Sequence, residues 1–302
     1  MRRLAIATLL VLAACGRSPS SPSTPASPPS APVALADFSG YWRGTMSQTS
    51  CVGLRHCELV IGRKDPFSFR LQQSGGRVAG VFSTGSNPPV AVEVGGDVQG
   101  DGSLALTGQS ATGGSKGLIE EYRFNAPALR LDAAAGLSGA VTLETETVAS
   151  SFAAATYTNG ATIVSADRRN LDAVVSDLSG TWRGRFLVNG CSASGIPICD
   201  PFRLDEVETL ELTLSVAGDT VTGELAQVSN YRVPIAGRVR GRTLELAGFK
   251  PASPGSMALR VTSFTATPDA FGRLAGTFSY VAESSVRSTT YDIALVQVVK
   301  NE

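Results

Sequence analysis

The chain has 302 residues, a length that favours two domains of roughly 130 residues, each large enough to form its own hydrophobic core. Its 26 basic and 26 acidic side chains cancel, which argues against a broad nucleic-acid-binding surface, because such a surface needs clustered lysine and arginine. A single histidine excludes most histidine-based catalysis and most zinc sites.

Residues 1–14 have the composition of a secretory signal peptide, with a basic start and an apolar run too short to stay in a bilayer as a spanning helix. The run ends in Leu-Ala-Ala-Cys at residues 12–15, which resembles the lipobox of bacterial lipoproteins. The resemblance implies cleavage before Cys15 and acylation of that cysteine, for example with palmitate, so that Cys15 anchors the protein in a lipid bilayer. An ordinary secretory signal with an incidental cysteine is the alternative.

The residue after Cys15 is Gly16, whereas an aspartate there favours inner-membrane retention in that family. The resemblance therefore implies a lipid-anchored protein of the cell outer membrane, periplasmic or surface-exposed. Residues 15–34 would form a tether, because residues 17–34 hold six serines and six prolines and almost no apolar side chains. Such a segment cannot bury enough surface to fold and is expected to be disordered.

An internal repeat follows the tether. Asp-Phe-Ser-Gly-Tyr-Trp-Arg-Gly at residues 37–44 recurs as Asp-Leu-Ser-Gly-Thr-Trp-Arg-Gly at residues 177–184, with six of eight positions identical. The similarity continues through later segments of both halves. We therefore expect a first repeat at residues 35–165, a linker at 166–176 and a second repeat at 177–302.

Apolar residues alternate with polar ones within each repeat, as in Leu210, Leu212 and Leu214, which indicates half-buried β-strands. No helical stretch is evident after the signal peptide. In the second repeat we expect eight strands, near 178–188, 207–216, 219–227, 230–238, 241–249, 257–267, 271–281 and 286–298. The connections are short, so the strands favour an all-β fold of two tandem eight-stranded antiparallel up-and-down β-barrels. A β-sandwich is the structural alternative.

The Gly-Tyr-Trp at residues 40–42 and the Gly-Thr-Trp at residues 180–182 resemble the Gly-x-Trp signature of lipocalins. Residues 178–182 with 221–224 are also similar to the opening hairpins of avidin-like proteins, the other calycin-type barrels. The lipocalin resemblance implies that Trp42 and Trp182 close the barrel floors, each packed by an arginine from the last strand. Arg287 is the candidate in the second repeat, and Ser150 stands near the matching place of the first. The chain has only two tryptophans, so biotin binding is not implied.

A cysteine pair follows each tryptophan motif, in the long first loop of each repeat. Cys51 with Cys57 and Cys191 with Cys199 are therefore expected to form two disulfide bonds in an oxidising compartment. A metal site built from Cys51, His56 and Cys57 is the alternative for the first pair. We expect no cofactor and no metal.

Nothing in the sequence indicates an enzyme. No Gly-x-Ser-x-Gly motif is present, a serine triad would have to use His56, and Asp205, Glu206 and Glu208 are typical of a solvated rim. A hydrolase with paired carboxylates stays a less favoured alternative. One charge asymmetry suggests that two turns attract each other and orient the barrels, although a solvated face is the simpler interpretation. Its members are Arg238, Arg240 and Arg242 in the second repeat and Asp97, Gln99 and Asp101 in the first.

The sequence favours a non-catalytic binding module, because an eight-stranded barrel is just wide enough for one small apolar ligand. Phe67, Phe69, Leu71, Leu244, Leu246, Phe278 and Tyr280 are the candidate lining residues. The alternative is a structural scaffold with filled barrels that contacts another envelope protein. We expect no nucleic-acid partner.

Overall fold

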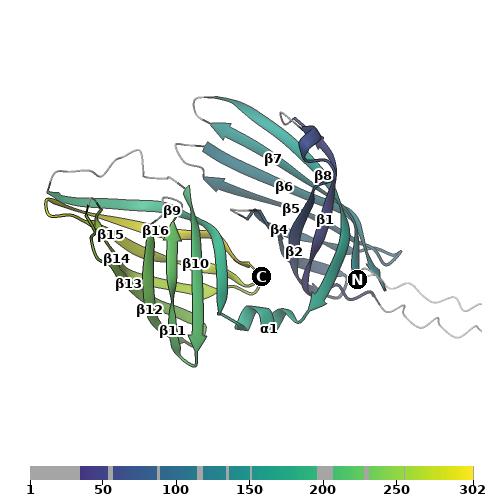
Figure 1. Ribbon diagram of the computed structural model, residues 1–302. Helices are drawn as coiled ribbons and strands as arrows, with labels where there is room; N and C mark the ends of the chain where they lie inside the picture. Colours follow the sequence, from purple (N-terminus) through teal and green to yellow (C-terminus); the bar gives the residue numbers. More distant parts are fainter. Residues whose placement is uncertain are drawn as a thin grey trace, which may run out of the picture. The chain divides into compact units, whose positions relative to one another are not determined.

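The computed structural model describes residues 35–53, 57–86, 89–113, 118–133, 136–149, 152–195, 207–227, 231–254 and 256–301. The signal peptide, Cys15 and the tether lie outside the described residues. Residues 35–302 form one compact unit. This unit contains two closed eight-stranded antiparallel barrels (Figure 1), which confirms the predicted fold and excludes the sandwich. Within the described ranges, no helix is long and apolar enough to cross a membrane.

The first barrel is a meander in which each strand pairs with the next one along the chain and β8 closes on β1. Its strands are β1 (Gly40–Val52), β2 (Lys64–Ser74), β3 (Arg77–Thr84), β4 (Ala91–Val98), β5 (Leu104–Gly113), β6 (Leu118–Asp132), β7 (Gly136–Ala149) and β8 (Phe152–Arg169). Tight turns join several of them because glycine occupies positive-φ positions, for example Gly75 with φ 61° between β2 and β3.

The second barrel repeats this order and closes between β16 and β9. Its strands are β9 (Gly180–Gly195), β10 (Val207–Ala217), β11 (Thr220–Gln227), β12 (Arg232–Arg240), β13 (Thr243–Lys250), β14 (Ala258–Pro268), β15 (Arg273–Glu283) and β16 (Arg287–Asn301). All eight predicted strands are present. The main difference is that β9 continues well beyond residue 188, because it stays paired with the equally long β16 as far as Gly195.

The connection between the barrels differs from the predicted linker at 166–176. Its first residues complete β8, which runs to Arg169, and the last six form a helix, α1 (Leu171–Ser176). The side chain of Asn170 caps α1 by accepting a hydrogen bond from the Ala173 amide at 3.2 Å. The expectation that no helix follows the signal peptide was therefore wrong, because one and a half turns are too short to show a helical period.

The predicted lining residues lie on the inward faces of their strands. All seven candidate lining residues are buried, and Leu210, Leu212 and Leu214 share the core face of β10. In the first barrel, phenylalanine rings fill the half nearest Trp42, with the Phe82 and Phe124 centroids 4.5 Å apart. The barrels are thus packed rather than open tubes over much of their length.

The repeated motif forms the same contacts in both barrels. In the first copy, the Asp37 carboxylate accepts a hydrogen bond from the backbone N–H of Ser39 at 3.0 Å. The Ser39 hydroxyl accepts one from the backbone N–H of Gln73 at 3.1 Å. The Trp42 indole donates to the Phe38 carbonyl at 2.9 Å and is almost fully buried.

In the second copy, Asp177 accepts from the Ser179 amide at 3.0 Å, and Ser179 accepts from the Val216 amide at 3.1 Å. The Trp182 indole donates to the Leu178 carbonyl at 3.1 Å and is fully buried. The motif is therefore one structural device used twice, which explains why its polar residues recur.

A basic residue from the last strand accompanies each tryptophan, although not the one expected. Arg168 of β8 lies over the Trp42 ring, with its Cζ 5.5 Å from the centroid, and pairs with Asp37 at 2.5 Å. In the second barrel, Lys300 of β16 pairs in register with Trp182 and forms a 2.6 Å ion pair with the equivalent aspartate. The assignment of Arg287 was wrong, because Arg287 lies at the opposite end of β16.

The barrels contact each other through a buried junction. Arg70 of β2 is fully buried, with its Cζ 5.2 Å from the centroid of the Tyr41 ring and its Nη2 donating to the Lys300 carbonyl at 3.2 Å. Beside it, Val81 of the first barrel clusters with Val299 of the second. The junction thus combines apolar packing with a cation that is held by an aromatic ring and a carbonyl.

The charged turns do not form this junction. Arg238 and Arg240 each pair with Glu245 of their own barrel at 3.1 Å, and Asp101 pairs with Arg130 of its own barrel. Among the described residues no ion pair joins the two turns, and three of their five charged side chains pair within their own barrel, so the structure gives the predicted attraction no support.

Candidate functional site: a cavity in the first barrel

A cavity of about 230 Å³ lies in the first barrel, at the end opposite Trp42. It is lined by the last part of β1, the start of β2, the end of β3, Tyr122 of β6, the later part of β7 and the middle of β8. Neighbouring strands are antiparallel, so these strand parts meet at one end of the barrel. We call this end the mouth and the Trp42 end the floor.

The cavity has an apolar interior and a polar rim. Apolar side chains form its inner wall: Met46, Phe82, Val141, Leu143 and Ala161, together with Tyr122. Polar side chains gather towards the mouth: Gln48, Arg63, Asp65, Thr84, Ser86, Thr145, Tyr157 and Asn159. This combination of an apolar body with a few convergent polar groups is typical of small-molecule sites.

Gln48 of β1 is a buried polar group of the rim whose side-chain orientation is fixed. Its side chain is only 8% exposed, and its Nε2 donates to the Asp65 carboxylate at 3.0 Å. An ionised carboxylate only accepts hydrogen bonds, so this contact fixes the amide nitrogen towards Asp65 and the amide oxygen away from it. Among the described residues, Oε1 of Gln48 has no hydrogen-bond partner.

Asn159 of β8 presents a second amide in the same lining. Within the part of the chain that the structure describes, its Oδ1 is also buried and without a hydrogen-bond partner. Leaving a buried acceptor unsatisfied costs about 1–3 kcal/mol, and most such groups in proteins are paired. Two such oxygens in the lining of one cavity therefore indicate a site for a hydrogen-bond donor.

The segment between β1 and β2 supports this rim. The backbone N–H of Gln48 donates to the backbone carbonyl of Arg63 at 2.9 Å. The backbone N–H of Gly62 donates to the backbone carbonyl of Gln48 at 2.8 Å. Arg63 also forms a salt bridge with Asp65 at 2.9 Å. Backbone bonds and the ion pair together hold Gln48 and Asp65 in a fixed relative position.

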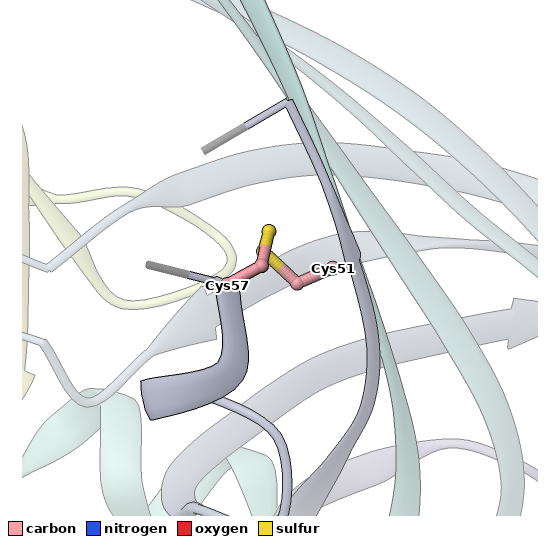
Figure 2. The surroundings of a disulfide bond; sticks show 2 residues. All are labelled: Cys51 and Cys57. Carbon is pink, nitrogen blue, oxygen red and sulfur yellow. A yellow bond between two sulfur atoms is a disulfide. The ribbon is translucent and has the colours of Figure 1, made fainter. Parts of the chain in front are cut away.

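A disulfide closes the same segment, between Cys51 at the end of β1 and Cys57 in a short 3₁₀ helix, η1 (Cys57–Leu59) (Figure 2). This confirms the first predicted pair, although Cys51 lies in a strand rather than in a loop. The bond uses both sulfurs, which rules out the alternative metal site, and His56 lies outside the described residues. In the described ranges, no cluster of three histidine, cysteine or acidic side chains could hold a metal ion.

The second cysteine pair is described only in part. Cys191 lies inside β9, not in a loop, because that strand is longer than expected. Its sulfur is disulfide-bonded. Cys199 lies outside the described residues, so the Cys191–Cys199 pairing stays a prediction. Asp205 and Glu206 of the predicted rim also lie outside them, whereas Glu208 is half-buried in β10.

The second barrel is an internal reference for the cavity, because the strand registers correspond. In the first barrel Gln48 pairs with Ala161, and in the second Val188 pairs with Ile293 at the equivalent place. A polar residue and a methyl group are thus replaced by two branched aliphatic side chains, both buried in the second core.

On the neighbouring strands β7 and β8, larger side chains replace residues of the cavity lining. Val141 corresponds to Phe278, because these residues pair with Ala161 and Ile293 respectively. By the same register, Leu143 and Asn159 correspond to Tyr280 and Tyr291, whose rings lie 6.1 Å apart. In the second barrel, larger side chains therefore occupy the positions of Val141, Leu143, Asn159 and Ala161. Smaller ones, Leu259, Ala282 and Thr289, stand at the positions of Tyr122, Thr145 and Tyr157.

One side of the cavity wall is supported from the second barrel. Tyr122 of β6 donates to Glu120 at 2.5 Å, and Arg185 of β9 forms a 2.8 Å ion pair with the same carboxylate. Burial and the Glu120 hydrogen bond raise the pKa of Tyr122. Burial alone would raise the pKa of Glu120, but the hydrogen bonds from Tyr122 and Arg185 lower it overall. The phenol proton is thus committed to Glu120 at neutral pH, and Tyr122 offers its ring to the cavity.

A larger hollow of about 680 Å³ lies on the surface, lined by residues around the start of α1 such as Arg168 and Asn170. It is open to solvent, and none of its lining side chains is a buried polar group without a partner among the described residues. The mouth cavity is therefore the better candidate site.

Sequence reasoning did not identify the cavity residues. Gln48 and Asn159 belong to no motif, and the predicted lining residues of the first barrel lie in its filled half. A usable signal was present in the alignment of the two repeats. Gln48 aligns with Val188, so the first repeat has a polar residue at a position that is apolar in the second.

Neither a protein-family model nor a curated protein matches the chain. Among solved structures, a crystal structure of a DUF3598-family protein with unknown function from Nostoc punctiforme PCC 73102 was matched at 12% identity. The match covers 86% of this chain and 96% of that chain, with a TM-score of 0.21. A score this low supports no conclusion about this chain.

Proposed function

We propose that this protein is a lipid-anchored envelope protein whose first barrel binds a small, largely apolar molecule. The observation that carries the proposal is the cavity of about 230 Å³, with its apolar wall and polar rim. The second barrel is a support, since larger side chains stand at the positions equivalent to Val141, Leu143, Asn159 and Ala161, and Arg185 holds the cavity wall. This filled interior favours a scaffold role for the second barrel.

The proposed binding is not catalytic. Among the described lining residues, the cavity offers one carboxylate, that of Asp65, and this group is already paired with Arg63. Paired-carboxylate hydrolysis needs two acids that face one substrate.

Filling the cavity is expected to abolish binding without disturbing the fold. Ala161→Ile and Val141→Phe copy the direction of change found at Ile293 and Phe278 of the second barrel, where these larger side chains pack within the same fold. Residues 35–302, secreted into the periplasm and studied by native mass spectrometry, should carry a small organic molecule that is lost on denaturation. Both variants should lose this extra mass.

Ala79→Ile is the matched control, because Ala79 lies exposed on β3, outside the cavity. It should keep the bound molecule. A native protein that carries no molecule and takes up no neutral apolar probe would contradict the proposed function, and so would a cavity-filled variant that binds as well as the native protein.

The anchoring rests on the Leu-Ala-Ala-Cys sequence and the proline-rich segment that follows it. Cys15→Ser in the full chain should prevent incorporation of labelled palmitate and move the protein from the detergent-rich to the aqueous phase on Triton X-114 partitioning. Several acyl chains bind a bilayer firmly, at about 0.8 kcal/mol per buried CH₂. Labelling that persists in the variant would exclude Cys15 as the acylated residue.

A further inference from the structure

We infer that the first barrel selects a neutral ligand whose apolar body carries a hydrogen-bond-donating head, such as a hydroxyl group, and that Gln48 is the residue that recognises this head. The inference rests on the proposed function and names the class of its ligand. It follows from three features of the cavity: the fixed amide of Gln48, the local charge balance and the available volume.

The orientation of Gln48 decides between donor and acceptor ligands. Its amide nitrogen is held by Asp65 at 3.0 Å, so the group available to a ligand is the oxygen Oε1. Asn159 on the adjacent strand adds another buried oxygen, and within the described residues neither oxygen has a partner. A ligand that only accepts hydrogen bonds would leave both oxygens unpaired, whereas a hydroxyl donates a hydrogen to one of them.

The charges of the rim favour a neutral head. Asp65 is already compensated by Arg63 at 2.9 Å, so a cationic head would bring in a charge without a free counter-ion. The cavity wall below the rim is apolar, and burying an uncompensated charge there is unfavourable. The site therefore disfavours ammonium and carboxylate heads.

The volume limits the apolar body. A water molecule occupies ~30 Å³ in the liquid, so the cavity has room for about eight groups of that size. Octan-1-ol and its isomer heptyl methyl ether are suitable probes, because they have the same atoms and differ in whether the oxygen can donate. Octylammonium tests the charge argument.

The experiment is isothermal titration calorimetry of residues 35–302 with the three probes. The alcohol should bind about five- to tenfold more tightly than the ether, the ratio expected for one additional hydrogen bond, and octylammonium should bind more weakly than the alcohol. Gln48→Met keeps the length of the side chain and removes the acceptor. The alcohol should then bind no more than about twofold more tightly than the ether. Gln109→Leu is the matched control, because Gln109 is exposed on β5 outside the cavity, and it should keep the native ratio.

The possible failures can be told apart. If no probe binds the native protein, the proposed function itself is wrong. If alcohol and ether bind equally, or if Gln48→Met keeps the native preference, the barrel binds apolar molecules but Gln48 does not select a donor. Tighter binding of octylammonium would overturn the preference for a neutral head. Should Gln48→Met not fold, Asn159→Leu takes its place, with a reduced preference expected and an unchanged preference counting against the inference.

Discussion

Trp182→Ala is expected to destabilise the second barrel by about 3–5 kcal/mol, the usual range for deleting a large buried aromatic side chain. Trp182 is fully buried, and its indole donates a hydrogen bond to the Leu178 carbonyl at 3.1 Å. Truncation therefore leaves a large cavity at the floor and removes a buried hydrogen bond. Urea unfolding followed by far-ultraviolet circular dichroism measures the change.

Phe249→Ala is the control for this experiment. Phe249 is an aromatic residue of the same barrel that is 47% exposed and contacts Arg260 on the outer surface. Its truncation should lower the free energy of unfolding by less than about 1 kcal/mol. Equal losses in the two variants would contradict the role of Trp182 as the packed floor of the barrel.

Gly44→Ala is expected to destabilise the first barrel by at least about 3 kcal/mol, or to prevent its folding, although it adds only one methyl group. A Cβ atom at Gly44 would lie 1.7 Å from the Ser165 carbonyl oxygen, which belongs to the backbone of the paired strand β8. The clash is with backbone, so it cannot be relieved by rotating a side chain. The β1–β8 pairing that closes the barrel would have to shift.

Gly95→Ala provides the comparison within the same barrel. A Cβ atom at Gly95 would meet only the Val78 carbonyl oxygen, at 3.8 Å, and the residue has no positive φ. This variant should be neutral or slightly more stable than the native protein, because alanine restricts the unfolded chain. Thermal unfolding of both variants tests the pair, and a Gly44→Ala protein as stable as Gly95→Ala would disprove the argument.

The fold was predictable because each repeat alternates its apolar residues with period two, and turn residues separate the strands. Leu210, Leu212 and Leu214 pointed to one face, and the structure buries all three. The sequence did not reveal α1, which has only six residues, or the full length of β9. Both depend on tertiary contacts: α1 packs Leu171 and Val175 against Tyr41, and β9 follows β16.

The site was less accessible than the fold. Whether an inward residue lines a cavity or fills a core depends on the sum of several side-chain volumes from different strands, which no local pattern encodes. Ala161 shows this. An inward alanine alone does not indicate a cavity, and the space beside it becomes evident only when its neighbours Val141 and Met46 are known. Arg168 and Lys300, the basic residues paired with the tryptophans, were missed for a similar reason, since they depend on strand register across the closure of the barrel.

The placement of one tryptophan at each floor gives every barrel its own optical reporter. The chain holds only two tryptophans, Trp42 and Trp182, and their indoles make equivalent hydrogen bonds. Replacing either one with phenylalanine leaves a single tryptophan, so the melting of each half can be followed separately by fluorescence excited where tyrosine does not absorb. Trp42 lies at the end opposite the cavity mouth, so its emission reports on the folding of the first barrel. Ligand binding in the cavity is measured directly by calorimetry or native mass spectrometry.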